Sequence, residues 1–82
     1  MTDIKFYWRP GCGFCRMLEH KLSNHDVPFT KINIWEVPGA AAVVRSHARG
    51  NETVPTVVIG NVGLVNPSAN DVIAEAKAQN AF

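Results

Sequence analysis

The 82-residue sequence predicts one α/β domain, built on a mixed four-stranded sheet with three flanking helices. Three observations support this prediction. Short runs of β-branched and aromatic residues alternate with helical patterns along the chain. The first two predicted strands are separated by a helical stretch, which is typical of a right-handed parallel crossover. The last two predicted strands are joined by a short turn, which indicates an antiparallel pair.

The first half of the chain supplies two strands and one helix. Ile4–Trp8 is an apolar and aromatic run that ends at turn residues, and we interpret it as a strand. Between Cys15 and Ser23, Leu18 and Leu22 lie four residues apart, which predicts one buried helical face. Phe29–Ile34 comes close to the alternation of a half-buried strand.

The next stretch predicts a second helix and a hairpin. Pro38 is a good first helical residue, and an Ala-rich helix over Ala40–Ala48 is expected to follow it. Pro55–Ile59 is β-branched and is bounded by glycine, so it predicts a strand. Gly63–Val65 is expected to pair with it through a short turn.

The last helix is predicted from a cap and an apolar stripe. Asn66 is expected to cap this helix, with Pro67 at its first position. Val72 and Ile73 belong to the apolar stripe, and the helix is expected to run to about Gln79.

The bulk composition excludes several classes of protein. Eight Lys and Arg against seven Asp and Glu give a formal charge of +1, which offers no electrostatic case for binding nucleic acid or an anionic membrane. No apolar run approaches the roughly 18 residues of a membrane span. Met1–Lys5 lacks the pattern of a signal peptide, so we expect a cytoplasmic protein.

Cys12 and Cys15, the two cysteines of the chain, are the candidate catalytic residues. A disulfide between them closes so small a loop that stability is not its expected purpose. Cys12 lies where a predicted strand turns into a helix, and the unpaired N–H groups of a helix N-terminus stabilise a thiolate. A separation of three residues on a helical turn places the Cα atoms roughly 5–6 Å apart, which suits a disulfide. We therefore predict Cys12 as the exposed nucleophile and Cys15 as the more buried resolving thiol.

Two other interpretations of this pair stay open. A CxxC pair supplies two of the four ligands in many zinc sites. However, the chain has no second CxxC, and His20 follows Cys15 too closely for the usual spacing of a zinc finger, so we expect no metal site. The second alternative is a pair of inert thiols, which is disfavoured because buried structural cysteines seldom follow Pro-Gly at a helix start.

Several segments of the chain resemble a known family. The segment Tyr7–Cys15, YWRPGCGFC, resembles the active-site segment of glutaredoxins, and Thr53–Thr56 resembles their Thr-Val-Pro turn. Gly50–Val57 and Leu64–Ser68 resemble the mycoredoxin branch, the mycothiol-linked glutaredoxin-like proteins. The resemblance covers nearly the whole chain and implies a single glutaredoxin-like redox domain over residues 1–82, with the thioredoxin-like (glutaredoxin-type) fold.

The resemblance also implies the surroundings of the cysteines. It implies a cis bond before Pro55, which would face both sulfurs, and a Val54 backbone that pairs with the backbone of a bound thiol. Phe14 is expected to form a wall of the small-thiol groove. Arg9 is expected to add positive charge near Cys12. The candidate substrate-thiol residues are Arg9, Gly11, Gly13, Phe14, Thr53, Val54, Pro55, Asn66, Pro67 and Ser68.

The implied function is a thiol–disulfide oxidoreductase that reduces mixed disulfides between proteins and a small thiol. Glutaredoxins commonly carry Cys-Pro-Tyr-Cys and Gly-Gly-x-x-Asp segments. This chain has Gly13-Phe14 and Val65–Ser68 instead, which favours mycothiol over glutathione as the co-substrate, with no tightly bound cofactor. Two alternatives stay open, a dithiol electron donor reduced by thioredoxin reductase and an iron–sulfur or zinc carrier.

The expected partners follow from the same resemblance. They are a small-molecule thiol, proteins that carry mixed disulfides, and either a mycothiol disulfide reductase system or thioredoxin reductase. We expect no nucleic acid and no membrane as partners, and a monomeric state.

Overall fold

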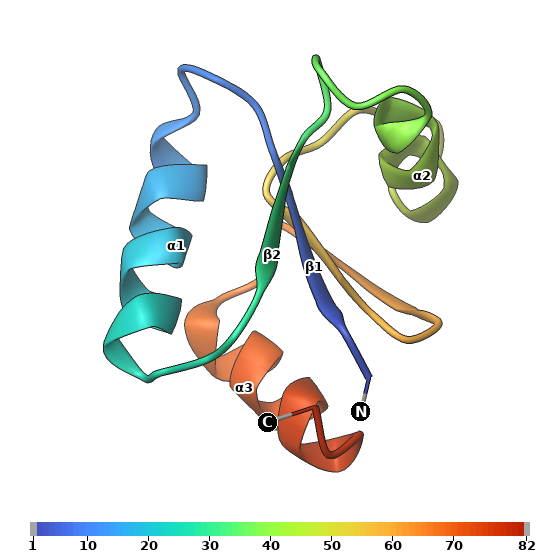
Figure 1. Ribbon diagram of the computed structural model, residues 1–82. Helices are drawn as coiled ribbons and strands as arrows, with labels where there is room; N and C mark the ends of the chain where they lie inside the picture. The colour runs from blue at the N-terminus through green and yellow to red at the C-terminus, as the bar shows by residue number, and fades with distance from the viewer. Residues whose placement is uncertain (1, 82) are drawn as a thin grey trace.

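The structure is a computed structural model that describes residues 2–81. Its elements follow the predicted order: β1 (Ile4–Trp8), α1 (Gly13–Asn24), β2 (Thr30–Asn33), α2 (Ala40–His47), β3 (Thr56–Ile59), β4 (Val62–Val65) and α3 (Ala69–Ala78). The four strands form one sheet in the order β2-β1-β3-β4, and Figure 1 shows α1 and α3 on one side of it and α2 on the other. The predicted mixed four-stranded sheet with three helices, the thioredoxin-like fold, is confirmed.

Strand directions bring four connecting segments to one end of the sheet. β1 runs parallel to β2 and antiparallel to β3, and β3 runs antiparallel to β4. The segments after β1, after β2, before β3 and after β4 therefore meet at the same end, which lies at the top of Figure 1. We call it the Cys12 end, because Cys12 follows β1 there.

The sheet separates two hydrophobic cores. The larger core lies between the sheet, α1 and α3, and its fully buried side chains are Phe6, Leu22, Val57, Ile59, Val72 and Ala76. The smaller core lies under α2, and its buried side chains are Tyr7, Ile34, Ala40, Val44, Ala48 and Val58. Because adjacent strand residues point to opposite faces, neighbours such as Val57 and Val58 belong to different cores. β1 and β3 are therefore packed between the two cores, in the middle of the molecule.

The predicted helix over Ala40–Ala48 agrees with α2 to within one residue, but Pro38 is not its first helical residue. Pro38 was expected to be the first helical residue, but the helix begins at Ala40. Gly39 is the N-cap residue with a φ of 83°, in the left-handed region that glycine adopts without a steric penalty. The N–H of Ala40 donates to the carbonyl of Val37 at 3.1 Å, so Pro38 lies inside a turn that precedes the helix.

The predicted start of α3 is also wrong, since Ser68 and not Asn66 is its N-cap. Ser68 Oγ accepts the N–H of Asp71 at 3.1 Å, and the Asp71 carboxylate accepts the N–H of Ser68 at 3.3 Å. This reciprocal pair satisfies two backbone donors, more than a cap at Asn66 would. Asn66 has a φ of 49° and lies with Pro67 in the segment before the helix. The bounds of the other elements differ from the prediction by at most two residues.

No helix within residues 2–81 combines the length and the apolarity that crossing a membrane requires. The longest, α1, has 12 residues, and its buried face is balanced by charged side chains such as Arg16 and Lys21 on the exposed one. Its apolar stripe is thus used for packing on the sheet.

Candidate active site

Cys12 and Cys15 lie at the start of α1 and are joined by a disulfide, with their Cα atoms 5.3 Å apart. Cys12 is the N-cap residue of α1, with extended backbone, and its Sγ accepts the N–H of Cys15 at 3.2 Å. In the reduced protein, this N–H and the positive end of the helix dipole would stabilise negative charge on the Cys12 sulfur. Cys15 lies inside the first turn, on the buried face of the helix with Leu18 and Leu22. The two thiols are therefore not equivalent, as the sequence predicted.

The prediction that Cys12 is exposed is wrong. Its side chain is only 7% exposed, against 2% for Cys15. As the cap residue, Cys12 turns its sulfur back over the first helical turn, and this sulfur lies 3.8 Å from the carbonyl oxygen of Val54. The predicted difference in role between the two cysteines is therefore supported by the N-cap position of Cys12 and not by its exposure.

The turn before β3 brings Val54 and Pro55 to the cysteines. The bond between Val54 and Pro55 is cis, as the resemblance implied. Thr56 Oγ donates to the carbonyl of Thr53 at 2.7 Å and closes this turn. The N–H of Asn66 donates to the carbonyl of Pro55 at 2.8 Å, which joins the segment after β4 to the same turn. Thr53, Val54, Pro55 and Asn66 thus form one connected structure beside Cys12.

Gly11, Gly13 and Phe14 leave the start of α1 open to solvent. Gly11 has a φ of 80°, a conformation that favours glycine, and it turns the chain from β1 toward the helix. A Cβ atom added at Gly13 would meet no atom within 4 Å. The Phe14 side chain is 68% exposed and is free to contact a bound molecule.

Pro67 and Ser68 offer no free backbone N–H to a bound molecule. The hydroxyl and the N–H of Ser68 are both used within the capping box of α3. Pro67 is half-buried and has no N–H to donate. Of the predicted segment Asn66–Ser68, Asn66 is exposed, and its backbone N–H is the group that bonds to the turn at Pro55.

Comparison with known proteins assigns this arrangement to a family. The glutaredoxin family model matches residues 4–64, a span that includes both cysteines and the turn at Pro55. The chain belongs to the glutaredoxin family. Together with the Cys12–Cys15 pair, this membership makes it a thiol–disulfide oxidoreductase.

Solved structures of other glutaredoxins share the fold. The glutaredoxin grx-1 from Archaeoglobus fulgidus has a TM-score of 0.73 and 23% identity, over 90% of this chain and 85% of that one. The glutaredoxin from Brucella melitensis has a TM-score of 0.69 and 26% identity, over 98% and 87%. A buckwheat glutaredoxin–glutathione complex has a TM-score of 0.65 and 16% identity, over 95% and 71%. No match was found among curated proteins.

Trp35 is a residue of the Cys12 end to which the sequence assigned no role. The Arg9 guanidinium lies 5.8 Å from the centroid of the Trp35 ring. The N–H of Trp35 donates to Asn33 Oδ1 at 2.9 Å, and the N–H of Ile34 donates to the carbonyl of Trp8 at 2.9 Å. An Asn that accepts the N–H two residues later is a known turn signal. From the sequence alone, this signal does not locate the turn, because the end of β2 must be known first.

Potential metal ligands do not gather around the cysteine pair. Within residues 2–81, no three or more His, Cys, Asp or Glu side chains are grouped so as to hold a metal ion. His20 and His25 are exposed on or just after α1. The His47 ring lies over Gly63, where a Cβ atom would clash with it, so this histidine packs α2 against β4.

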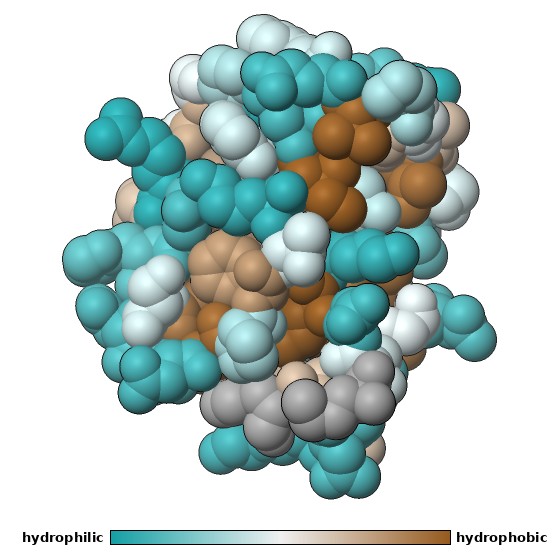
Figure 2. All heavy atoms as spheres, viewed as in Figure 1, coloured by the Kyte–Doolittle hydropathy of each residue, from teal (hydrophilic) through white to brown (hydrophobic). Residues whose placement is uncertain are grey.

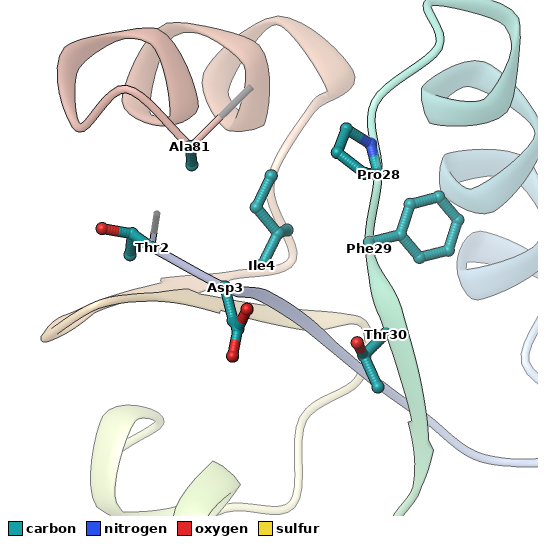
Figure 3. A pocket seen from close by; sticks show the side chains of 7 residues that line it. All are labelled: Thr2, Asp3, Ile4, Pro28, Phe29, Thr30 and Ala81. Carbon is teal, nitrogen blue, oxygen red and sulfur yellow. The ribbon is translucent and has the colours of Figure 1, made fainter.

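A separate hollow lies at the end of the sheet opposite to Cys12. Its volume is about 220 Å³, and Figure 3 shows the side chains around it: Thr2, Asp3, Ile4, Pro28, Phe29, Thr30 and Ala81. These residues belong to the starts of β1 and β2 and to the segment after α3. None of the predicted site residues lines this hollow, so it is not part of the active site.

Proposed function

We propose that this glutaredoxin reduces mixed disulfides between proteins and a small thiol, with mycothiol as the small thiol. The observation that carries the proposal is the pair of contacts at Cys12 Sγ. The N–H of Cys15 lies 3.2 Å away and the carbonyl of Val54 lies 3.8 Å away. The first contact stabilises an attacking thiolate. The second places that thiolate beside a backbone segment suited to pairing with a bound cysteine derivative.

The proposed reaction has two thiol–disulfide exchanges. The Cys12 thiolate attacks the small-thiol sulfur of the mixed disulfide, so an S–S bond forms between Cys12 and the small thiol, and the protein leaves as a thiolate. A second small thiolate then attacks the sulfur of the bound small thiol. It releases the symmetric small-thiol disulfide and restores the Cys12 thiolate. In the net reaction, one free small thiol is consumed, the protein thiol is regenerated, and the small thiol of the mixed disulfide leaves as part of the symmetric small-thiol disulfide.

Buckwheat glutaredoxin, which has the same fold, forms a complex with glutathione, and this supports a small thiol as the co-substrate. Two features of the sequence favour a small thiol other than glutathione. This chain lacks the Gly-Gly-x-x-Asp segment common in glutaredoxins, and its Leu64–Ser68 segment resembles mycoredoxins instead. In our proposal, mycothiol is a co-substrate that enters and leaves in each turnover.

The test is the turnover of a protein–mycothiol mixed disulfide by cysteine variants. With mycothiol and its reductase present, we expect Cys15→Ser to retain turnover and Cys12→Ser to lose it. Loss of turnover in Cys15→Ser alone would instead indicate the dithiol route, in which Cys15 resolves the intermediate and thioredoxin reductase supplies electrons. Wild-type rates measured side by side with mycothiol, glutathione and thioredoxin reductase test the choice of thiol. A faster reaction with glutathione than with mycothiol would refute that choice.

A further inference from the structure

Exposed apolar side chains concentrate near Cys12. The large hydrophobic side chains exposed within residues 2–81 are Phe14, Met17, Trp35, Val37, Val43, Val62 and Val65. Four of these seven lie in the first turns of α1 or in the loop after β2: Phe14, Met17, Trp35 and Val37. We call these four residues the apolar rim. Single exposed hydrophobic residues are ordinary, but a group of them beside a reactive sulfur indicates a binding surface.

The sheet order separates half of this rim from the small-thiol groove. Cys12 follows β1, and the turn at Val54 and Pro55 lies on the β3 side of β1. Trp35 and Val37 follow β2, on the other side of β1. In Figure 1 both loops lie at the top of the sheet, where the loop from β1 turns toward α1 and the loop after β2 turns toward α2. The contact between Arg9 and Trp35 joins them. Groups bound on the two sides of the Cys12 sulfur therefore contact different residues.

Met17 extends the rim along α1. It lies three residues after Phe14, so both side chains are neighbours on the helix surface. The buried face of the same helix carries Cys15, Leu18 and Leu22, so the rim side chains take no part in the core.

The Trp35 side chain is 64% exposed and lies beside Arg9. The backbone N–H of Trp35 donates to Oδ1 of the buried Asn33, which fixes the backbone from which the ring projects. The Arg9 guanidinium lies 5.8 Å from its ring centroid, a distance suited to a cation–π contact. An anchored aromatic ring loses little conformational entropy on binding, and for this reason Trp residues often dominate the affinity of an interface.

The charges beside the rim favour an acidic partner. Arg9 and Arg16 lie three residues before and four residues after Cys12. The two salt bridges found within residues 2–81 join Glu19 to Lys31 and Glu52 to Arg45, and neither uses these two arginines. Glu36 is the one carboxylate in the loop between β2 and α2, so positive charge exceeds negative charge around the rim.

We propose that the apolar rim docks the protein half of the mixed disulfide. This inference rests on the proposed function. The occupant is an extended polypeptide segment with a large apolar residue next to its disulfide-bonded cysteine and an acidic residue nearby. The small thiol lies on the Val54 side of Cys12, and the protein segment lies on the Trp35 side. Attack of Cys12 on the small-thiol sulfur then releases the protein sulfur, which lies on the far side of the breaking bond.

The test compares two substrates that carry the same small thiol, chosen as the one that sustains turnover. One substrate is a mixed disulfide with a peptide that has Leu and Asp beside its cysteine, and the other is a mixed disulfide with free cysteine. We expect Trp35→Ala to raise the KM for the peptide by about 30-fold, the smallest loss that marks an interface hot spot. We expect the KM for the cysteine substrate to stay unchanged. Raising the salt concentration is expected to raise only the peptide KM.

Two further variants serve as controls. Val37→Ala leaves the contact between Arg9 and Trp35 in place, and we expect it to raise the peptide KM by a smaller factor. Val62→Ala removes an exposed apolar side chain at the far end of β4, where Val62 pairs with Ile59, and we expect no change with either substrate. Circular dichroism melts of all variants check that each is folded.

Two results would overturn the inference. If Trp35→Ala raises the KM for both substrates equally, the rim binds the small thiol. If it raises neither KM, the rim binds no substrate. Binding is also measured without turnover, by NMR titration of the wild type with the same peptide in which Ser replaces Cys. The two proposals can fail separately. If the protein turns over no mixed disulfide but its Trp35 indole signal shifts when the peptide is added, the proposed function is refuted and peptide docking at the rim is supported.

Discussion

Cys12 is both the N-cap residue of α1 and the candidate nucleophile, two roles that different residues usually fill. Helix N-caps are mostly Ser, Thr, Asp or Asn, whose side-chain oxygen accepts an N–H of the first turn. Here a sulfur accepts that N–H at 3.2 Å. Since the donor belongs to the backbone, no single side-chain substitution nearby removes it. This also explains why sequence spacing identified the cysteine pair correctly but failed to predict the low exposure of Cys12: the inward turn of its sulfur follows from the cap geometry.

Tyr7 makes the stability of the fold depend on pH in the alkaline range. It is 5% exposed under α2, and burial raises the pKa of its phenol above the usual 10.0. The folded protein thus retains the phenol proton at a pH where the unfolded chain has released it. The free energy of unfolding is therefore unaffected by this group below the pKa of the unfolded chain. It falls as the pH rises from that value toward the higher pKa of the folded protein. We expect the free energy of unfolding to fall more steeply above about pH 10 in the wild type than in Tyr7→Phe.

Urea denaturation at neutral and at alkaline pH checks this expectation. The comparison with Tyr7→Phe removes the contribution of the other titrating groups, because they are common to both proteins. Equal pH slopes in the two proteins would show that the burial of Tyr7 has no influence on its ionisation.

At the level of elements, periodicity was a reliable guide and helix starts were not. The apolar run of β1 and the spacing of Leu18 and Leu22 predicted their elements because both patterns follow directly from packing against one sheet. The start of α2 depends on the left-handed backbone of Gly39, which a residue pattern does not reveal. For α3, Ser68 and Asp71 have the spacing of a capping box, but Asn66-Pro67 matches another common start signal two residues earlier.

The two candidate caps of α3 differ in their expected effect on stability. Ser68→Ala removes the acceptor of the Asp71 N–H, and we expect a loss of about 1 kcal/mol in the free energy of unfolding. Asn66→Gly keeps the backbone hydrogen bond to Pro55, and glycine adopts the φ of 49° without strain. We therefore expect Asn66→Gly to change stability by only a few tenths of a kcal/mol. Chemical denaturation of both variants measures the difference, and a Ser68→Ala variant as stable as the wild type would contradict the capping role of Ser68.

At the level of the whole molecule, the mixed sheet assembles the active site from segments distant in sequence. Family resemblance predicted that Val54 and Pro55 lie beside the cysteines, and the structure shows the Val54 contact. The approach of Trp35 to Arg9 was not predicted. It depends on the register in which Trp8 lies opposite Asn33, and register is a tertiary property that side-chain patterns specify only weakly when a strand is as short as β2.

The fold is expected to be largely independent of the redox state of the cysteines. The bond between Cys12 and Cys15 spans a separation of three residues, while the strands of the sheet and the core under α2 contain neither cysteine. Loop-closure entropy for so short a loop stabilises the fold by at most about 2 kcal/mol. We expect the reduced protein to unfold in one transition at a slightly lower urea concentration than the oxidised protein. Parallel denaturation with and without reductant measures this shift, and an unfolded reduced form would contradict it.

Thr2 and Ala81 line the same hollow, at the end of the molecule opposite to Cys12 (Figure 3). This closeness suits the protein to engineering. A fluorescent reporter or a surface tether attached at either terminus would extend away from the redox centre and leave its approach unobstructed. A short linker between the two ends would also permit circular permutation, with the new termini opened in an exposed turn such as the one between β3 and β4.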